Sequence, residues 1–260
     1  MSDASPAPLL QLKQCTIRFG GLTAVSTFDL QINENELVGL IGPNGAGKTT
    51  VFNLITGVYR PTEGEIFFNG KSIVGIKPNG IAECGIARTF QNIRLFPSLS
   101  VFDNVRVAFH LHLSCGVRQA LWRGKAFFIE EKTVDAQVVE MLEIFGLGKF
   151  RDVPAKSLPY GDQRRLEIVR ALATKPKLLC LDEPAAGMNP TEKVELMRLI
   201  RFVREKFQIS ILLVEHDMKV VMGICQRIAV LDYGIKIAES TPEEIQKNPK
   251  VIEAYLGSEN

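Results

Sequence analysis

A glycine-rich run at residues 42–49 constrains the fold of this chain more than any other feature. It reads Gly-Pro-Asn-Gly-Ala-Gly-Lys-Thr, directly follows the apolar segment 38–41, and fits the phosphate-binding loop pattern G-x-x-x-x-G-K-[ST] at every defined position. Glycines let backbone amides approach a triphosphate closely, and the helix that begins near Lys48 adds the positive end of its dipole. The run therefore predicts an α/β fold in which Lys48 reaches the β- and γ-phosphates and Thr49 holds Mg²⁺.

Two other interpretations of this run are weaker. A tight strand-to-helix turn that binds nothing is one alternative to a phosphate site. A dinucleotide-binding fold is disfavoured, because the glycines are not spaced G-x-G-x-x-G and such a fold does not require the Lys-Thr pair.

Composition excludes several classes of protein. The 260 residues suffice for one large domain, or one domain with a lobe, and 31 Lys and Arg against 29 Asp and Glu leave a net charge of +2, with no basic field for nucleic acid. Five cysteines, an odd number without a C-x-x-C pair, suggest neither a disulfide framework nor a zinc site, so we expect reduced, cytosolic thiols. Without a signal-peptide pattern or a stretch of about 18 apolar residues, the chain is expected neither to be exported nor to span a membrane by itself.

Periodicity divides the chain into a strand-rich start, a helical middle and an alternating end. Early strands are expected at 9–19, 26–32, 38–41 and 64–69, with a helix at 49–56, and later strands at 178–181, 209–214 and 227–231. This order predicts a small antiparallel sheet beside a mostly parallel one. The middle contains a helix at 134–145, and Thr241 and Asn248 begin two helices of the tail, the first with capping-box spacing. The basic and aromatic segment 111–128 is interpreted as a solvated helical excursion, with contact to lipid headgroups as the alternative.

A second set of candidate residues ends an apolar strand. The segment 178–183 reads Leu-Leu-Cys-Leu-Asp-Glu, so Asp182 and Glu183 lie at a carboxyl end, where open α/β sheets bind ligands. Asp182 suits a water-mediated contact to Mg²⁺, and Glu183 suits the base that orients an attacking water. A buried strand that ends in Asp-Glu is common, so the prediction depends on the glycine loop.

Four further segments carry a family resemblance. They are Ser-Leu-Pro-Tyr-Gly-Asp-Gln-Arg-Arg-Leu at 157–166, Arg-Phe-Gly-Gly-Leu-Thr-Ala-Val at 18–25, Glu-Pro-Ala-Ala-Gly-Met-Asn-Pro at 183–190 and Glu-His-Asp-Met at 215–218. With the glycine loop, they make nearly the whole chain resemble the nucleotide-binding subunit of an ATP-binding-cassette (ABC) transporter. Within that superfamily the chain is most similar to the ATP-binding proteins of branched-chain amino-acid importers.

The resemblance implies a P-loop NTPase fold of ABC type, with a mixed, mainly parallel sheet core, a small antiparallel β-subdomain and an α-helical subdomain. A single domain, 1–260, is then expected to divide into a core with its antiparallel lobe at about 9–90 and 155–240, a glutamine loop with the helical subdomain at about 91–154, and a helical tail at about 241–260.

The resemblance also implies the site. Phe19 matches the aromatic residue that stacks on adenine, Gln91 the glutamine that contacts Mg²⁺ and the lytic water, and His216 the histidine that reaches the γ-phosphate. Without it, Phe19 is most simply a core residue, Gln91 an ordinary loop residue and His216 structural. The catalytic residues implied are Lys48, Gln91, Glu183 and His216, and the Mg²⁺ contacts are Thr49, Gln91 and Asp182. The nucleotide contacts implied are Phe19, Val25, Gly42, Pro43, Asn44, Gly45, Ala46, Gly47, Lys48, Thr49 and Thr50, with Gly161 supplied in trans by a second subunit.

The signature segment departs from the family pattern. The superfamily usually has Leu-Ser-Gly-Gly-Gln, whereas this chain has Leu-Pro-Tyr-Gly-Asp at 158–162. Pro159 lacks the hydroxyl that donates to a γ-phosphate, and Asp162 places an anion where an amide is expected. Gly161 keeps its amide at a helix start. The segment therefore serves a weaker composite site, or Gly161 and the partner's residues suffice.

The resemblance implies ATP and Mg²⁺ as ligands, a second ATP-binding subunit, and membrane permease subunits that dock near Gln91, Arg94, Leu95 and Phe96 on the cytoplasmic face of the membrane. An ATPase of a lipid or lipopolysaccharide exporter is the nearest alternative. A soluble cassette ATPase of translation or DNA repair is a different class, but it usually has two cassettes or a long coiled-coil insertion. A GTP-binding switch would need an Asn-Lys-x-Asp guanine reader, which is absent, and a non-catalytic cassette is disfavoured by Lys48, Glu183 and His216.

Overall fold

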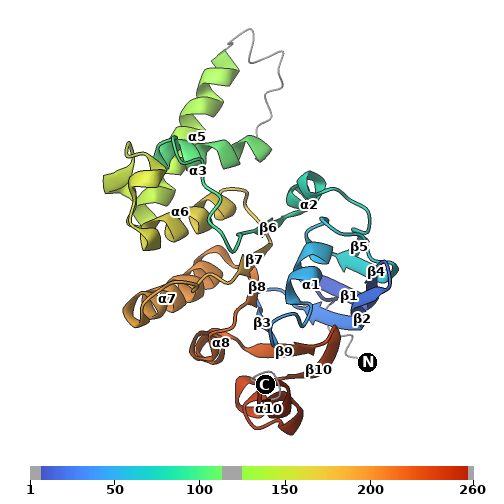
Figure 1. Cartoon of the computed structure of the whole chain (residues 1–260). Coiled ribbons are helices and arrows are strands. Elements are labelled where there is room, and N and C mark those ends of the chain that lie inside the picture. The colour runs from blue at the N-terminus through green and yellow to red at the C-terminus, as the bar shows by residue number, and fades with distance from the viewer. Residues whose placement is uncertain (1–6, 113–124, 257–260) are drawn as a thin grey trace, which may run out of the picture. The chain divides into compact units, whose positions relative to one another are not determined.

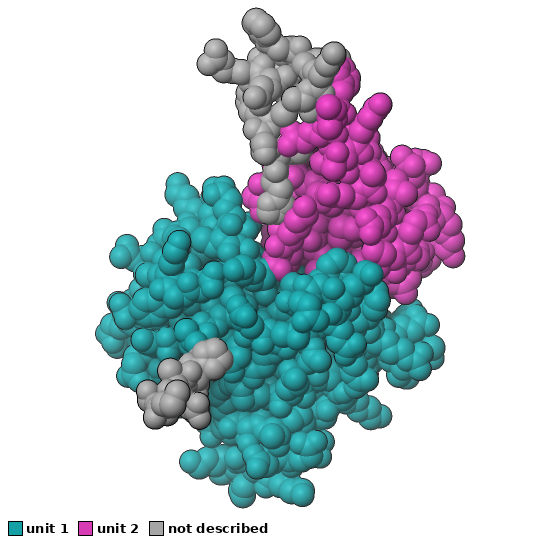
Figure 2. Space-filling model, turned by 180° about the vertical axis from the view of Figure 1, so that it is seen from behind, with its two compact units in different colours: residues 1–88, 177–260 teal, residues 89–176 magenta. Residues whose placement is uncertain are grey.

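The computed structural model describes residues 7–112 and 125–256. The chain forms two compact units, one made of residues 1–88 and 177–260 and the other of residues 89–176 (Figure 2). We expected 155–240 to lie in the core, whereas 155–176 is grouped with the second unit, because helix α6 (Tyr160–Leu172) packs against α3 (Val101–Phe109).

A six-stranded sheet forms the centre of the first unit, in the order β10-β9-β3-β8-β7-β6 (Figure 1). All neighbours are parallel except β9 and β10. Every residue of β3, β7 and β8 is buried, which explains their continuous apolar sequences. The strands are β3 (Leu37–Ile41), β6 (Ile86–Arg88), β7 (Leu178–Asp182), β8 (Ser210–Val214), β9 (Arg227–Asp232) and β10 (Ile235–Ser240).

A four-stranded antiparallel sheet, in the order β2-β1-β4-β5, completes the first unit. It contains β1 (Leu10–Phe19), β2 (Leu22–Ile32), β4 (Glu63–Phe68) and β5 (Lys71–Ser72), and the Asn-Gly turn at 69–70 joins the last two. Phe28 of this sheet, Phe52 of α1 and Leu40 of the central sheet belong to one buried hydrophobic cluster. The expected combination of a parallel core and a small antiparallel sheet is therefore confirmed.

The first unit also contains six helices among its described residues. They are α1 (Lys48–Ile55), α2 (Pro78–Cys84), α7 (Pro190–Phe207), α8 (Met218–Ile224), α9 (Pro242–Ile245) and α10 (Pro249–Leu256). A complete capping box opens α7, where Asn189 and Glu192 bond to each other's backbone N–H groups. The tail helix α9 begins where the sequence predicts, but the Thr241 side chain makes no cap hydrogen bond, so its capping box does not form.

The second unit is helical, with α3, α5 (Lys125–Ile144) and α6 as its main helices. Asn104 of α3 is fully buried, accepts a hydrogen bond from the Phe96 N–H and donates to the carbonyls of Phe96, Leu99 and Ser100. It thereby fixes the turn before α3. The basic and aromatic segment 111–128 falls largely on residues 113–124, outside the described residues. No helix in the described part of the chain has the length and apolar character needed to cross a membrane.

Candidate nucleotide-binding site

The glycine loop joins β3 to α1 and contains two positions where a side chain would clash with neighbouring backbone. Gly42 has φ +152°, and a Cβ atom there would lie 2.0 Å from the Leu231 carbonyl oxygen. Gly47 has φ +102°, and a Cβ atom there would lie 2.8 Å from the Ala24 carbonyl oxygen. The loop is therefore packed against neighbouring backbone at both ends, which leaves its N–H groups in a fixed arrangement. This is a cradle that fits a phosphate group.

Lys48 is buried at the start of α1, and its ammonium group points into this loop. Its Nζ donates to the carbonyl oxygens of Gly42 at 2.6 Å and Pro43 at 2.8 Å. Burial lowers the pKa of Lys48, and the charge of Glu183 opposes that shift. A cation held at a helix N-terminus beside bare backbone amides is suited to an anionic ligand. Thr49 is exposed on the next position, and Thr50 is half-buried.

Glu183 and His216 follow the adjacent strands β7 and β8. The Glu183 N–H donates to the Val214 carbonyl oxygen at 2.8 Å, and His216 Nδ1 lies 3.7 Å from Glu183 Oε2. Glu183 has φ +45°, an unfavourable backbone conformation for a residue with a side chain. Because Glu183 also influences the charge of Lys48, the structure places all three predicted catalytic groups of this unit at the carboxyl edge of the sheet.

Asp182, the last residue of β7, is buried and paired with a cation. Its Oδ2 lies 3.3 Å from Nη2 of Arg88, whose guanidinium also donates to Asn53 and Thr56 on and beside α1. The Arg88 guanidinium therefore orients the carboxylate expected to contact Mg²⁺ through water. Arg88 lies three residues before Gln91 and had no role predicted from the sequence, because it ends a strand of only three residues, β6.

The two expected base-side contacts differ in exposure. The Phe19 side chain is 44% exposed and meets the Tyr59 ring edge-on, with centroids 5.1 Å apart. An exposed aromatic face at a strand end can stack on a base. Val25 is fully buried and packs beneath Gly47, so its side chain supports the loop rather than facing a ligand.

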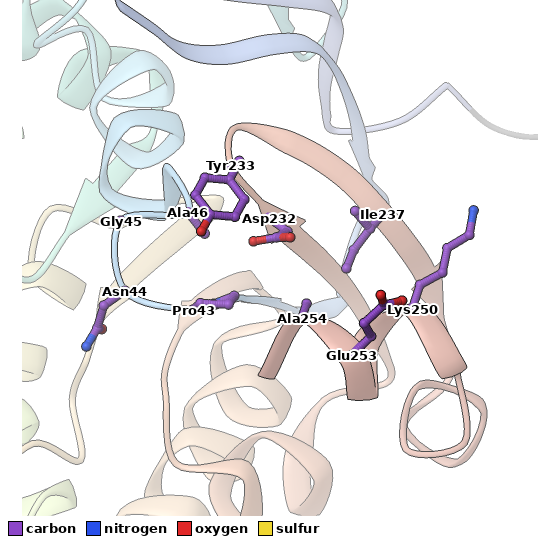
Figure 3. Close-up of a pocket in the computed structure, with 10 residues that line it drawn as sticks. All are labelled: Pro43, Asn44, Gly45, Ala46, Asp232, Tyr233, Ile237, Lys250, Glu253 and Ala254. Atoms are coloured by element: carbon purple, nitrogen blue, oxygen red, sulfur yellow. The ribbon is translucent and has the colours of Figure 1, made fainter. Parts of the chain in front are cut away.

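A cavity of about 360 Å³ adjoins the glycine loop, between the loop, the β9–β10 turn and α10 (Figure 3). Its lining omits Phe19, Lys48 and Glu183, so it lies beside the phosphate cradle rather than within it. Burial raises the pKa of the Tyr255 hydroxyl on α10. The Gly42 backbone opposes that rise, so the hydroxyl lies beside the glycine loop. The tail therefore packs against the loop, which the sequence did not predict. The lining residues are Pro43, Asn44, Gly45, Ala46, Asp232, Tyr233, Ile237, Lys250, Glu253 and Ala254.

Gln91 and Gly161 belong to the second unit, where Arg164 of α6 connects their segments. Arg164 is fully buried, and its guanidinium donates to the carbonyl oxygens of Phe90 and Gln91, each at 2.7 Å. It also bonds Glu167 at 2.8 Å, and Glu167 in turn accepts from the N–H groups of Phe90 at 3.4 Å and Arg94 at 3.1 Å. The segment around Gln91 is thus fixed to the helix whose first turn contains Gly161.

Asp162, which departs from the family's signature pattern, is paired with a nearby arginine. Asp162 lies in the first turn of α6, and its Oδ1 is 3.1 Å from Nη1 of Arg165. The Gln163 side chain donates to the Leu158 carbonyl oxygen at 2.8 Å, which closes the segment. The anion of Asp162 therefore has a cation one helical turn away, while Gly161 stays half-buried at the helix start.

Comparisons with known proteins agree with this arrangement. Residues 25–186 match the family model described as ABC transporter, and residues 236–259 match that of the branched-chain amino acid ATP-binding cassette transporter. This chain belongs to the ABC transporter family.

Similar relatives span nearly the whole chain. The high-affinity branched-chain amino acid transport ATP-binding protein BraF of Pseudomonas aeruginosa is 46% identical over 250 residues, which cover 96% of this chain and 98% of BraF. The corresponding protein LivG of Escherichia coli K12 is 47% identical with the same coverage. A crystal structure of an ATP-binding cassette of an ABC transporter in its ADP conformation has a TM-score of 0.83 at 29% identity, covering 96% of this chain and 99% of that one. The ABC-type fold expected from the sequence is confirmed.

Within this ABC ATPase, the predicted site residues fall into two groups. The glycine loop, Asp182, Glu183 and His216 lie in the first unit, and Gln91 and Gly161 lie in the second. Their roles stay predictions. Sequence reasoning missed Arg88, Arg164 and Tyr255, whose contacts depend on elements distant in the chain.

Proposed function

We propose that this chain is the ATP-hydrolysing subunit of an importer of branched-chain or related amino acids. The observation that carries the catalytic part is the convergence of Lys48, Glu183 and His216 beside a loop in which two positions exclude any side chain. The transported substrate is argued from the names of BraF and LivG and from the match of residues 236–259 to the branched-chain amino acid cassette. That C-terminal match favours the importer over the lipid or lipopolysaccharide exporter.

In the proposed mechanism, the loop amides and Lys48 hold the phosphates and Phe19 stacks on the adenine. Glu183 accepts a proton from the attacking water, and His216 donates to the γ-phosphate. Thr49, Gln91 and, through water, Asp182 would hold Mg²⁺, which neutralises charge on the phosphates when bound. The Arg88 guanidinium keeps the Asp182 carboxylate in place for such a contact.

The proposed assembly contains two such subunits and a membrane permease, with the chain peripheral at the cytoplasmic face. Gly161 of one subunit would contact the nucleotide of the other. The permease would dock on the segment after Gln91, where Phe96 is 45% exposed and the Arg94 guanidinium lies 4.4 Å from the Phe90 ring centroid. Exposed aromatic and arginine side chains are typical of protein interfaces.

The substitution Glu183→Gln tests the catalytic proposal. It should keep ATP binding and slow hydrolysis on the order of 10² to 10⁴-fold, since a general base is removed. ATPase turnover and binding of a non-hydrolysable ATP analogue are measured on the assembled transporter. The matched control is Glu36→Gln. Glu36 is half-buried and directly precedes β3, at the end of the strand away from the glycine loop, so this variant should keep wild-type turnover. Unchanged turnover in Glu183→Gln removes Glu183 from this role.

Transport tests the substrate. Vesicles that contain the assembled complex and its external binding protein should accumulate labelled leucine or valine only with ATP inside the compartment that faces this chain. Uptake of neither amino acid, with ATPase activity intact, contradicts the proposed substrate class and leaves the catalytic proposal standing.

A further inference from the structure

Glu215 is a fully buried carboxylate between the two catalytic loops of the first unit. It follows β8 directly and precedes His216, and its side chain has 0% exposure. Its Oε1 accepts a hydrogen bond from the Ala185 N–H at 2.8 Å. Its Oε2 accepts from the N–H groups of His216 at 2.8 Å and Asp217 at 3.1 Å. The carboxylate is thus held mainly by backbone donors.

The two carboxylate oxygens of Glu215 accept hydrogen bonds from two different loops. The Ala185 bond fixes the loop that leaves Glu183, and the other bonds fix the turn that presents His216 and begins α8. His216 Nδ1 lies 3.6 Å from Glu215 Oε2 and 3.7 Å from Glu183 Oε2. One side chain therefore bonds the backbones of both loops, beyond the point where β7 and β8 pair.

Neighbouring contacts reinforce the same junction. Asp217, which caps α8, bonds Lys193 of α7 at 2.6 Å, and that cation also acts on the Glu215 charge. No other residue type reproduces these bonds. Glutamine would turn an NH₂ group toward one of the backbone donors. Alanine would remove the acceptor of three backbone N–H groups, of which the Ala185 bond is buried and the other two are part-buried. Aspartate keeps the charge but is one methylene shorter.

We propose that Glu215 is a positioning residue for ATP hydrolysis, which sets the placement of His216 relative to Glu183. The inference rests on the proposed function, because it assigns Glu215 an effect through those two residues. A displacement of about 1 Å in a catalytic group can lower turnover by about 10²-fold. Glu215 lies outside the phosphate cradle, so its loss should alter turnover and leave nucleotide affinity nearly unchanged.

The test compares Glu215→Gln with wild type in the assembled transporter, by steady-state ATPase kinetics. We expect kcat to fall by about 10 to 100-fold, with KM within about twofold. The matched control is again Glu36→Gln, which removes one carboxylate that also accepts a backbone hydrogen bond, from the Asn33 N–H at 2.8 Å. An unchanged kcat, or a rise in KM that accounts for the whole loss of kcat/KM, overturns the proposal.

A double-mutant cycle separates positioning from general stabilisation. If Glu215 acts through His216, Glu215→Gln should have little further effect on kcat in a His216→Ala background. Independent, multiplying losses overturn the proposal. Should Glu215→Gln fail to fold, Glu215→Asp replaces it in the same cycle, with the same two outcomes. An assembled wild-type transporter without ATPase activity would instead contradict the proposed function itself.

Discussion

Arg164 and Glu167 form a buried ion pair whose strength can be measured, and the perturbation is Arg164→Met. The two side chains are 0% and 1% exposed, with 2.8 Å between Arg164 Nη1 and Glu167 Oε2. Methionine has a similar length and fills the space, but it leaves the Glu167 anion with the N–H groups of Phe90 and Arg94 and the charge of Arg170, without its bonded guanidinium. It also removes the donors of the Phe90 and Gln91 carbonyls.

The magnitude follows from these contacts. Removing one partner of a buried pair costs about 3–5 kcal/mol, because an uncompensated charge stays behind. The carbonyls of Phe90 and Gln91 are only part-buried, so each adds at most about 1–3 kcal/mol where no replacement partner is found, and these costs overlap. We therefore expect the unit 89–176 to lose at least about 3 kcal/mol, a large part of the roughly 5–15 kcal/mol that stabilises a typical domain.

The assay is hydrogen exchange by mass spectrometry on peptides from this unit, together with urea unfolding. The matched control is Arg151→Met, since Arg151 is 48% exposed and lies 4.0 Å from an exposed Asp152, a pair worth about 0–1 kcal/mol. The double variant Arg164→Met/Glu167→Met should be no less stable than Arg164→Met alone, because the buried anion is gone. A loss below about 1 kcal/mol in Arg164→Met, or a less stable double variant, refutes the reasoning.

Two further predictions concern the first unit. Phe19→Ala should weaken nucleotide binding by roughly 1–3 kcal/mol, by analogy with base–aromatic stacking, as measured by calorimetry beside Phe202→Ala at another exposed ring on α7. Equal affinities of wild type and Phe19→Ala would show that Phe19 does not stack on the base. Burial raises the pKa of the Cys180 thiol to about 12, so at pH 8 its reactive thiolate is scarce and increases only as pH rises. A thiol reagent should therefore label the exposed Cys84 in the native protein and Cys180 only after unfolding, and equal labelling rates by mass spectrometry contradict this burial.

The sequence predicted strands where apolar residues are continuous or alternate over several positions, and it missed two short or exposed strands of the central sheet. The apolar runs that became β3, β7 and β8 were found because every residue in them is buried. The strands β6 and β10 were missed. The first has three residues, too few for periodicity, and the second is an edge strand without a buried residue. Similarly, the structure has α5 from Lys125, whereas the predicted helix began at 134. The prediction was too short because Phe128 and Ile129 are exposed and break the apolar pattern.

Site residues within one motif were predictable, whereas their supports were not. The spacing of the glycine loop and the Asp-Glu strand end identified Lys48 and Glu183 directly. Arg164 and Arg165 are adjacent and chemically identical in sequence, yet the Arg164 side chain is fully buried and the Arg165 side chain is 30% exposed. Only the helical face of α6, fixed by tertiary packing, distinguishes the arginine that holds the Gln91 segment from the one that pairs with Asp162.

Buried carboxylates bond the candidate loops in both units, but the negative charge of each carboxylate has different partners. Glu215 accepts from backbone N–H groups, whereas Glu167 also has a guanidinium partner. In each case a single side chain bonds the backbone of a segment that carries a predicted catalytic residue, His216 or Gln91. These loops are therefore ordered by contacts made on folding, so nucleotide binding need not supply their ordering entropy. Ordering of these loops before binding lowers the cost of binding nucleotide.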